Sequence, residues 1–326
     1  MSAAERLPAR RMNTAADSAS SHGELTASPA AEETRRHLQA GTLSVRGRIP
    51  HASNAVLFGE VEHEGRTVPC VYKPVAGERP LWDFPDGTLA QREVAAYEIS
   101  RATGWDLIPA TVLREGPYGE GMCQAWVGQV PGAASDEASA EDAGPADGDA
   151  DADEDDDQEE SDAAGGLDLL AIVEGDVPGE GWKAVGHVDT GDERPSLLVH
   201  ADDERLRRLA VIDAVINNGD RKGGHLLPVP EGQLYAIDHG VSFHVDDKLR
   251  TLLWGWAGEE LTAEAAATLR GLSSAVADGA PLADRLSELI TPAELEALRK
   301  RIHALCRSGR HPLPSGDWPA IPWPPV

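Results

Sequence analysis

Alternating apolar and polar positions mark the first folded part of the chain. Three runs, 42–49, 54–63 and 67–73, show the period of two that is typical of strands with one buried face. Glu64-Gly65 between the last two runs is a turn signal. The pattern therefore predicts an antiparallel meander.

A helix is predicted to follow this meander. It begins at Thr88, where Thr88 and Gln91 form a capping box, and it ends at Gly104. Short apolar runs at 110–114 and 122–127 then predict two more strands.

The second folded part shows mainly helical periodicity. An apolar face at Leu206, Leu209, Ile212 and Ile216 predicts a helix, and a short strand is expected at 233–237. Thr291-Pro292 has the form of an N-cap followed by proline at the first helical position, so a final helix starts there, after two others.

Two segments lack any such pattern. Residues 1–38 are rich in Ala, Ser and Glu, and residues 131–166 are low-complexity Asp, Glu, Ala and Gly, so we expect both to be disordered. The folded parts are then 39–130 and 167–326, the latter ending in a proline-rich tail.

Charge and cysteine content narrow the class of protein. The net charge is -27, of which fifteen acidic residues in 135–162 contribute more than half, leaving about -12 elsewhere. Such a chain is repelled by nucleic acid and by anionic membrane surfaces, and it has no long apolar stretch for stable membrane insertion. Three widely spaced cysteines indicate reduced thiols, so we expect a cytoplasmic monomer without a disulfide framework or zinc site.

The candidate chemistry lies between residues 211 and 244. Asp220 opens a glycine-containing loop after the helical run, and Asp238 follows the short strand. Phosphoryl transfer needs one acid to orient the attacking hydroxyl and another to hold the metal ion that bridges the phosphates. The order of these two carboxylates fits that need.

The motifs around both carboxylates resemble those of a known family. N-x-D-R-x-x-x-x-L (Asn218 to Leu226) followed by A-I-D-H-G-x-x-F (Ala236 to Phe243) resembles the catalytic and metal-binding segments of the phosphatidylinositol 3-/4-kinase-like family. Among the characterised members, the type II 4-kinases are nearest. Within the superfamily the chain looks most like a bacterial branch that is common in actinobacteria and is more distantly related to HipA-type protein kinases. The resemblance implies an α+β, bilobal, atypical protein-kinase-like fold, with 39–130 as N-lobe and 167–326 as C-lobe.

The resemblance also assigns roles to residues in the N-lobe. V-Y-K-P resembles the segment whose lysine reaches the nucleotide phosphates, which makes Lys73 the phosphate ligand, and Glu93 is the carboxylate expected to hold it, with Glu98 as the rival. GMCQAWV resembles the strand and hinge that contact adenine. The cofactors implied are ATP with Mg²⁺ or Mn²⁺, and the candidate nucleotide contacts are Lys73, Glu93, Ser53, Asn54, Gln124, Trp126 and Val127. For Trp126 we favour a place in the core, because large aromatic side chains at strand ends most often simply pack.

In the C-lobe the resemblance implies Asp220 as the catalytic acid and Asp238 as a metal ligand. Arg221 and Lys222 are candidates for neutralising the transferred phosphoryl group. Arg221 has a second interpretation, a structural pair with a carboxylate such as Asp213, which suits a guanidinium. His239 is either a support for the site or a turn residue, and we favour the turn.

Two departures from the family pattern matter. His225 stands where the lipid kinases carry an asparagine that binds the second metal ion, and imidazole suits Mn²⁺ better than Mg²⁺. The PHASN turn that contains Ser53 and Asn54 replaces a glycine-rich loop, and it is equally well explained as a plain hairpin turn. A kinase with an unidentified hydroxyl acceptor (protein, lipid or small molecule) is therefore our hypothesis. A nucleotide-binding pseudokinase and an enzyme that transfers AMP to protein are the alternatives.

Overall fold

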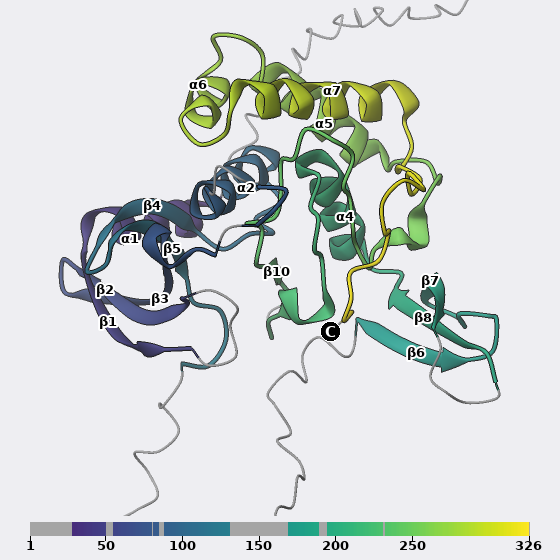
Figure 1. The fold of residues 1–326 in the computed structure, drawn as a ribbon, viewed down its shortest axis with the longest axis horizontal. Coiled ribbons are helices and arrows are strands. Elements are labelled where there is room, and N and C mark those ends of the chain that lie inside the picture. Colours follow the sequence, from purple (N-terminus) through teal and green to yellow (C-terminus); the bar gives the residue numbers. More distant parts are fainter. Residues whose placement is uncertain are drawn as a thin grey trace, which may run out of the picture.

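The computed structural model describes residues 28–49, 55–79, 81–84, 88–130, 169–188, 194–230 and 232–325. These residues form a mixed α and β structure in which all three sheets are antiparallel. One part consists of a five-stranded sheet with two helices, and the other of helices with two small sheets (Figure 1). No helix in the described ranges is both long and apolar enough to span a membrane.

The five-stranded sheet has the order β1-β2-β3-β5-β4. The predicted meander is confirmed, and the turn at Glu64 and Gly65 has positive φ at both residues, as a tight hairpin requires. In β3 the side chains of Val68, Cys70 and Tyr72 are buried in the core. Lys73 therefore points to the other face. The strands are β1 (Thr42–Arg48), β2 (Leu57–His63), β3 (Arg66–Pro74), β4 (Thr111–Gly116) and β5 (Gly119–Ala125).

The prediction that disorder extends to residue 38 is wrong over its last residues, because α1 spans Pro29–Ala40. The Ser28 side chain accepts a hydrogen bond from the backbone N–H of Ala31, and Pro29 stands in the first turn of the helix. Leu38 is fully buried, and Arg114 of β4 donates to the carbonyls of Leu38 and Gly41, so the end of the helix is held against the sheet.

The second N-terminal helix, α2 (Leu89–Thr103), lies between the sheet and the helices of the other part (Figure 1). The predicted Thr88 capping box is wrong, because Thr88 adopts a left-handed φ of 68° and its side chain does not cap the helix. The Glu78 carboxylate accepts the backbone N–H groups of Leu89 and Ala90 instead, at 3.1 and 2.8 Å. A negative charge at a helix N-terminus is favourable.

The C-terminal part contains the predicted helices. The Thr291 capping box is confirmed, with the Glu294 carboxylate accepting the Thr291 backbone N–H. The segment 175–192, to which the sequence assigned no role, contains a strand of the sheet ordered β6-β8-β7. The elements are β6 (Leu170–Glu174), β7 (Trp182–Val188), β8 (Ser196–Ala201), α4 (Glu204–Ile216), β9 (Leu226–Pro228), β10 (Leu234–Ala236), α5 (Ala263–Ala275), α6 (Pro281–Ser287) and α7 (Pro292–Ser308), with short 3-10 turns at Val75–Gly77, Gly223–His225 and Trp254–Trp256.

Buried polar groups join these elements. Arg92 of α2 pairs with Glu294 of α7 at 2.6 Å and donates to the carbonyl of Ser242. His200 of β8 is fully buried against Trp256, and its Nε2 accepts the backbone N–H of Gly255 at 3.0 Å. Burial lowers the pKa of His200 to about 4. The imidazole therefore stays neutral in the folded protein well below neutral pH.

We predict that acid destabilises the protein partly through His200. The unfolded imidazole takes up a proton near pH 6.5 whereas the folded one does not until about pH 4. Its contribution to stability is therefore complete above pH 6.5 and is lost progressively as the pH falls, by about 2 kcal/mol at pH 5. The free energy of unfolding, measured by urea titration, should be lower at pH 5 than at pH 7. In His200→Gln this decrease should be smaller by the contribution of His200. The exposed His303 of α7 supplies the control, His303→Gln. An unchanged pH dependence in His200→Gln contradicts the prediction.

Candidate active site

The loop that follows α4 is anchored by Asn217. This residue has a left-handed φ of 56°. Its side-chain nitrogen donates to the carbonyls of His244 and Asp246 at 2.9 and 2.6 Å, and its oxygen accepts the backbone N–H of Lys248 at 3.0 Å. Residues 217–220 and the segment after the Asp238 motif are thereby held side by side.

A buried ion pair lies directly beneath this loop. Arg221 donates from Nε and Nη2 to the two oxygens of Asp213, each at 3.0 Å, and both side chains are fully buried. Asn218 also donates to Asp213, and its own oxygen accepts the backbone N–H of Asp220. The structural interpretation of Arg221 is confirmed. The catalytic role expected for it is not, because a guanidinium enclosed in this way cannot reach a transferred group.

His239 connects the ion pair to the N-terminal part. Its Nε2 lies 2.6 Å from Arg221 Nη2. Since arginine can only donate, Nε2 accepts and the proton is on Nδ1, which faces the Glu93 carboxylate at 3.8 Å. The backbone N–H of His239 donates to the same Glu93 oxygen at 2.8 Å. The expectation that His239 is simply a turn residue is wrong.

Lys73 is the point where three segments meet. Its Nζ lies 2.8 Å from Glu93 Oε1 and 2.7 Å from Asp238 Oδ1. Glu93 is buried and uses one oxygen for Lys73 and the other for His239. The rival candidate, Glu98, pairs with Arg101 at 2.9 Å and does not take part. Lys73 is therefore held between a buried carboxylate and a half-exposed one.

Asp238 is brought to this point by the β9–β10 hairpin. The residue has a φ of 64°, a left-handed conformation that is unusual for a side chain other than glycine. Its second oxygen lies 3.4 Å from His225 Nε2, and Ile237 donates its backbone N–H to the His225 carbonyl. His225 and Asp238, which the sequence proposed as metal ligands, thus lie side by side.

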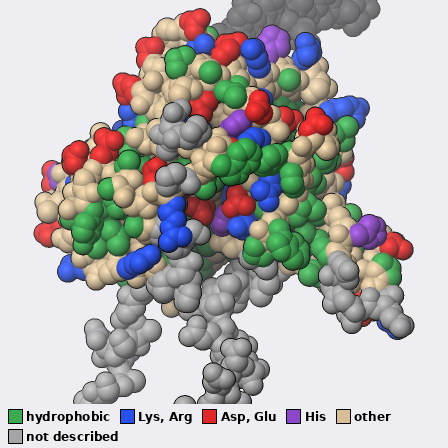
Figure 2. Space-filling model, in the orientation of Figure 1, with side chains coloured by type: hydrophobic (Ala, Val, Ile, Leu, Met, Phe, Trp, Pro, Cys, Tyr) green, Lys and Arg blue, Asp and Glu red, His purple; other side chains and the backbone are tan. Residues whose placement is uncertain are grey.

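Asp220 and Lys222 complete the group. Lys222 Nζ pairs with Asp220 Oδ2 at 3.2 Å, and the Lys222 backbone N–H lies 3.4 Å from His225 Nδ1. Figure 2 shows acidic, basic and histidine side chains gathered in the recess between the two parts of the molecule. A chain of contacts therefore runs from Asp220 to Lys73.

The close contacts and burial of these groups shift their pKa values. Burial opposes the charge on Lys73, but the carboxylates of Glu93 and Asp238 outweigh it and raise the pKa of Lys73 well above its ordinary value. Lys73 lowers the pKa of Asp238 strongly, and His225 adds to the effect. Burial lowers the pKa of His225, and burial with the nearby Arg221 lowers that of His239 far below the usual range. At neutral pH the site combines charged Lys73 and Asp238 with two neutral imidazoles.

The residues expected around adenine are only partly available. Gln124 is buried in β5 between β3 and β4, and its side chain donates to Thr111 at 2.9 Å, so the side chain supports the sheet. The adenine contact expected at 124–127 involves backbone groups and stays a prediction. The Trp126 backbone N–H donates to the carbonyl of Pro69, and its ring packs edge-on against Phe58. Val127 follows the strand and is half-buried. Ser53 and Asn54 lie outside the described residues.

The site therefore offers two neighbouring donor atoms, but no ready-made metal cage. In the part of the chain that the structure describes, no group of three or more His, Cys, Asp or Glu side chains is arranged to hold a metal ion. Asp238 can supply one oxygen, and His225 can supply Nε2 if the imidazole proton moves from Nε2 to Nδ1, which now accepts from the Lys222 N–H. The charged Lys73 next to them can bind an anion, and Asp220 can accept a proton.

Two residues that position the candidate site were missed or misjudged from the sequence. Glu78 caps α2, the helix that carries Glu93, and His239 joins Glu93 to Arg221. Glu78 lies eleven residues before Leu89, the first residue of the helix, so no local capping pattern includes it. For His239 the sequence allowed a supporting role, but nothing local to it indicated that its side chain would be buried against Arg221.

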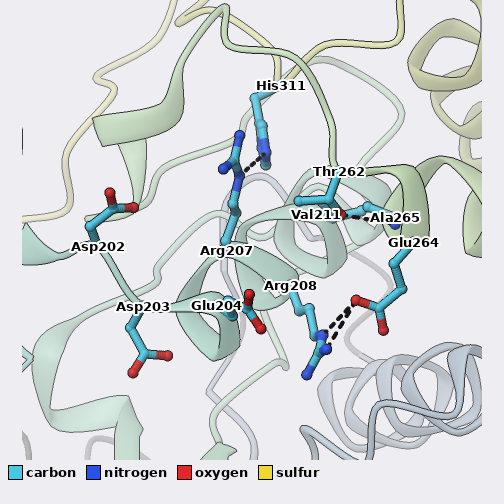
Figure 3. Close-up of a pocket in the computed structure, with 10 residues that line it drawn as sticks. All are labelled: Asp202, Asp203, Glu204, Arg207, Arg208, Val211, Thr262, Glu264, Ala265 and His311. Carbon is cyan, nitrogen blue, oxygen red and sulfur yellow. Dashed lines mark hydrogen bonds and ion pairs between the residues drawn. The ribbon is translucent and has the colours of Figure 1, made fainter.

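A separate pocket of about 450 Å³ lies at the start of α4 and of α5, away from this group (Figure 3). Arg207 points toward His311 and Arg208 toward Glu264, so its charges are largely paired within the chain. Its lining consists of Asp202, Asp203, Glu204, Arg207, Arg208, Val211, Thr262, Glu264, Ala265 and His311. None of the site residues predicted from the sequence belongs to that set.

No family model matches the chain. The chain is 46% identical over 289 residues to Protein Rv2133c of Mycobacterium tuberculosis, and the match covers 88% of this chain and 93% of that protein. A match of this length extends over both folded parts of the chain. The chain therefore belongs to the same family as the mycobacterial Protein Rv2133c.

Proposed function

We propose that the protein is an ATP-dependent phosphotransferase of the phosphatidylinositol 3-/4-kinase-like type, with a bilobal kinase-like fold. One observation carries the proposal: Lys73 of β3 contacts both Glu93 of α2 and Asp238 after β10. A kinase needs these three groups together, because the lysine must be held beside the phosphates and beside the metal-binding carboxylate.

The donor atoms fit a small divalent ion. Two ligands that are each about 2.1 Å from a metal and at right angles to each other lie about 3.0 Å apart, and His225 Nε2 and Asp238 Oδ2 are separated by 3.4 Å. Magnesium and manganese sites in such enzymes commonly take one or two protein ligands and complete the shell with phosphate and water. When bound there, the ion would neutralise charge on the nucleotide phosphates.

The other residues have distinct tasks. Lys73 would bind the phosphates, and Glu93 would fix its direction. Asp220 would orient the acceptor hydroxyl and take its proton while the hydroxyl oxygen bonds to the γ-phosphorus and the bond to the bridging oxygen of ADP breaks. Lys222, paired with Asp220 at 3.2 Å, would neutralise the transferred group. Val127 at the end of β5 is the backbone position proposed for adenine.

A nucleotide-binding pseudokinase is the second candidate, and His225 favours it. A histidine at the second metal position weakens binding of Mg²⁺, which prefers oxygen ligands. Transfer of AMP to protein from the same site is distinguished by its product, since it releases pyrophosphate and a kinase releases ADP.

We predict that label from γ-labelled ATP is transferred in the presence of Mg²⁺ or Mn²⁺ and is lost in Asp220→Ala and in Asp238→Ala. Both changes remove groups required in the transition state, so the rate falls by at least about 100-fold. Label is followed in protein, lipid and water-soluble fractions. Asp246→Ala, which removes an exposed carboxylate in the adjoining segment, is the control and retains activity. Measurable nucleotide binding without label in any fraction favours the pseudokinase.

Glu93→Gln is expected to lower kcat/KM for ATP on the order of 100-fold, because an amide holds the Lys73 ammonium less firmly and small misplacements are costly. The matched control is Glu98→Gln on the same helix, whose carboxylate pairs with Arg101. Steady-state kinetics of both variants provide the comparison. If kcat/KM falls equally in the two variants, the substitutions act by disturbing α2, and the loss does not report on the position of Lys73.

His225→Asn is predicted to shift the metal preference. The amide oxygen suits Mg²⁺ better than imidazole does, so the ratio of Mn²⁺-supported to Mg²⁺-supported rates should fall about tenfold. Metal titrations of the labelling rate measure that ratio. If the ratio equals that of the wild type, His225 does not bind the metal ion. This variant does not test Asp238.

A further inference from the structure

The tail after α7, residues 311–325, lies against the loops of the proposed active site (Figure 1, yellow). The Ala320 carbonyl accepts the backbone N–H of Thr251 at 3.0 Å and the ring N–H of Trp254 at 2.8 Å. Thr251 in turn pairs with Arg221 in a parallel bridge. The tail is therefore separated from the loop after α4 by one extended segment.

The beginning of this stretch is fixed by aromatic rings around a cation. Lys248 Nζ lies 4.5 Å from the ring centroid of Trp318 and 4.6 Å from that of Trp82. The same ammonium pairs with Asp83 at 2.9 Å. A cation over an aromatic face is attracted to it, and Trp82 and Asp83 belong to the segment that precedes α2. The tail is thus anchored where the N-terminal part meets the segment that follows the Asp238 motif.

The end of the tail reaches the 3-10 turn Gly223–His225. The Pro325 carbonyl accepts the backbone N–H of Gly223 at 2.9 Å, and Gly223 is buried. The first N–H groups of a helical turn have no acceptor within the turn, and a buried N–H without an acceptor is costly. The tail supplies this acceptor from the far end of the sequence.

This turn places two residues of the proposed chemistry. Lys222, just before it, pairs with Asp220 at 3.2 Å, and His225 at its end has Nε2 3.4 Å from Asp238 Oδ2. Two of the bonds inside the turn are long: the Lys222 N–H lies 3.4 Å from His225 Nδ1, and the His225 N–H lies 3.2 Å from the Lys222 carbonyl. Long hydrogen bonds are weak, so contacts from outside hold the turn. Ile237 holds its end at 3.0 Å, and the tail holds its start.

We propose, on the basis of the phosphotransferase function proposed above, that the tail is a positioning element of the active site. It holds the 222–225 turn so that His225 stays beside Asp238 and Lys222 beside Asp220. The tail acts through the turn and takes no part in the chemistry itself. Groups that orient a metal ligand from behind typically contribute about 10- to 100-fold to metal affinity. The tail should therefore raise the affinity for a nucleotide that carries a metal ion.

A chain that lacks residues 324–326 tests the proposal, and Trp323→Ala, which removes a ring that is 77% exposed, is the matched control. Isothermal titration measures the affinity for adenylyl imidodiphosphate, a non-hydrolysable ATP analogue, with Mn²⁺ and with EDTA. In the deletion variant the affinity with Mn²⁺ should fall at least about tenfold. The affinity with EDTA should be unchanged, because Lys73 and Glu93 are retained. Trp323→Ala should match the wild type in both.

Hydrogen exchange shows whether the turn is the part that moves. Exchange of the amides in 219–226 should become faster in the deletion variant, while the amides of α7 keep their protection and so report that the variant is folded. In the wild type, the buried Gly223 amide should exchange more slowly than that of the exposed Gly224. This comparison tests the bond to Pro325 without any variant.

Unchanged exchange of 219–226 in the deletion variant, or equal exchange of Gly223 and Gly224 in the wild type, would overturn the proposal. Equal losses of affinity with Mn²⁺ and with EDTA, or none with Mn²⁺, would show that the tail is merely structural. A wild type that gains no affinity from Mn²⁺ would reject the metal site and the positioning role together. A wild type that transfers no label, but whose Mn²⁺-dependent affinity falls in the deletion variant, would reject the phosphotransferase and retain the role of the tail.

Discussion

The buried pair between Asp213 and Arg221 is the interaction on which the proposed active site depends. Two fully desolvated charges are stable only when every lone pair and proton is used, and removing one partner of such a pair costs on the order of 3 to 5 kcal/mol. Here Asn218, His239 and the carbonyl of Ile237 supply the additional hydrogen bonds. The pair therefore fixes the backbone on both sides of Asp220 and, through His239, the position of Glu93.

The same network explains why two distant parts of the chain act as one unit. Glu93 belongs to α2, and its two oxygens are bound to Lys73 of β3 and to the backbone of His239. The preceding residue of α2, Arg92, pairs with Glu294 of α7. Arg92 and Glu93 are both buried, and burying their charges is tolerated because each has a partner in the opposite part. The polar contacts of α2 therefore determine how the sheet packs against the C-terminal helices.

Much of this arrangement was predictable from local patterns, and the rest was not, for physical reasons. The strands of the first sheet and the Thr291 cap follow from alternation and from short-range capping chemistry. The pairing of Lys73 with Glu93 was expected from the family resemblance, and local patterns alone did not distinguish Glu93 from Glu98. Glu78 as the cap of α2 and the bridge made by His239 depend on contacts between residues that are remote in sequence or that change role with burial. That the Gln124 side chain faces Thr111 could not be predicted, because its direction depends on how β5 pairs with β4.

The backbone at Asp238 gives an independent reason to regard this loop as functional. A left-handed φ at a residue other than glycine costs on the order of 1 kcal/mol or more and persists only when the surroundings impose it. Asp238 has a φ of 64°, and the hairpin bonds of β10 before it and the Glu93 contact to His239 after it leave little freedom. Glycine would relieve this strain at a position that served only as a turn. An aspartate held there directs its carboxylate toward Lys73 and His225. The strained backbone is therefore explained if the loop serves to keep this carboxylate in place.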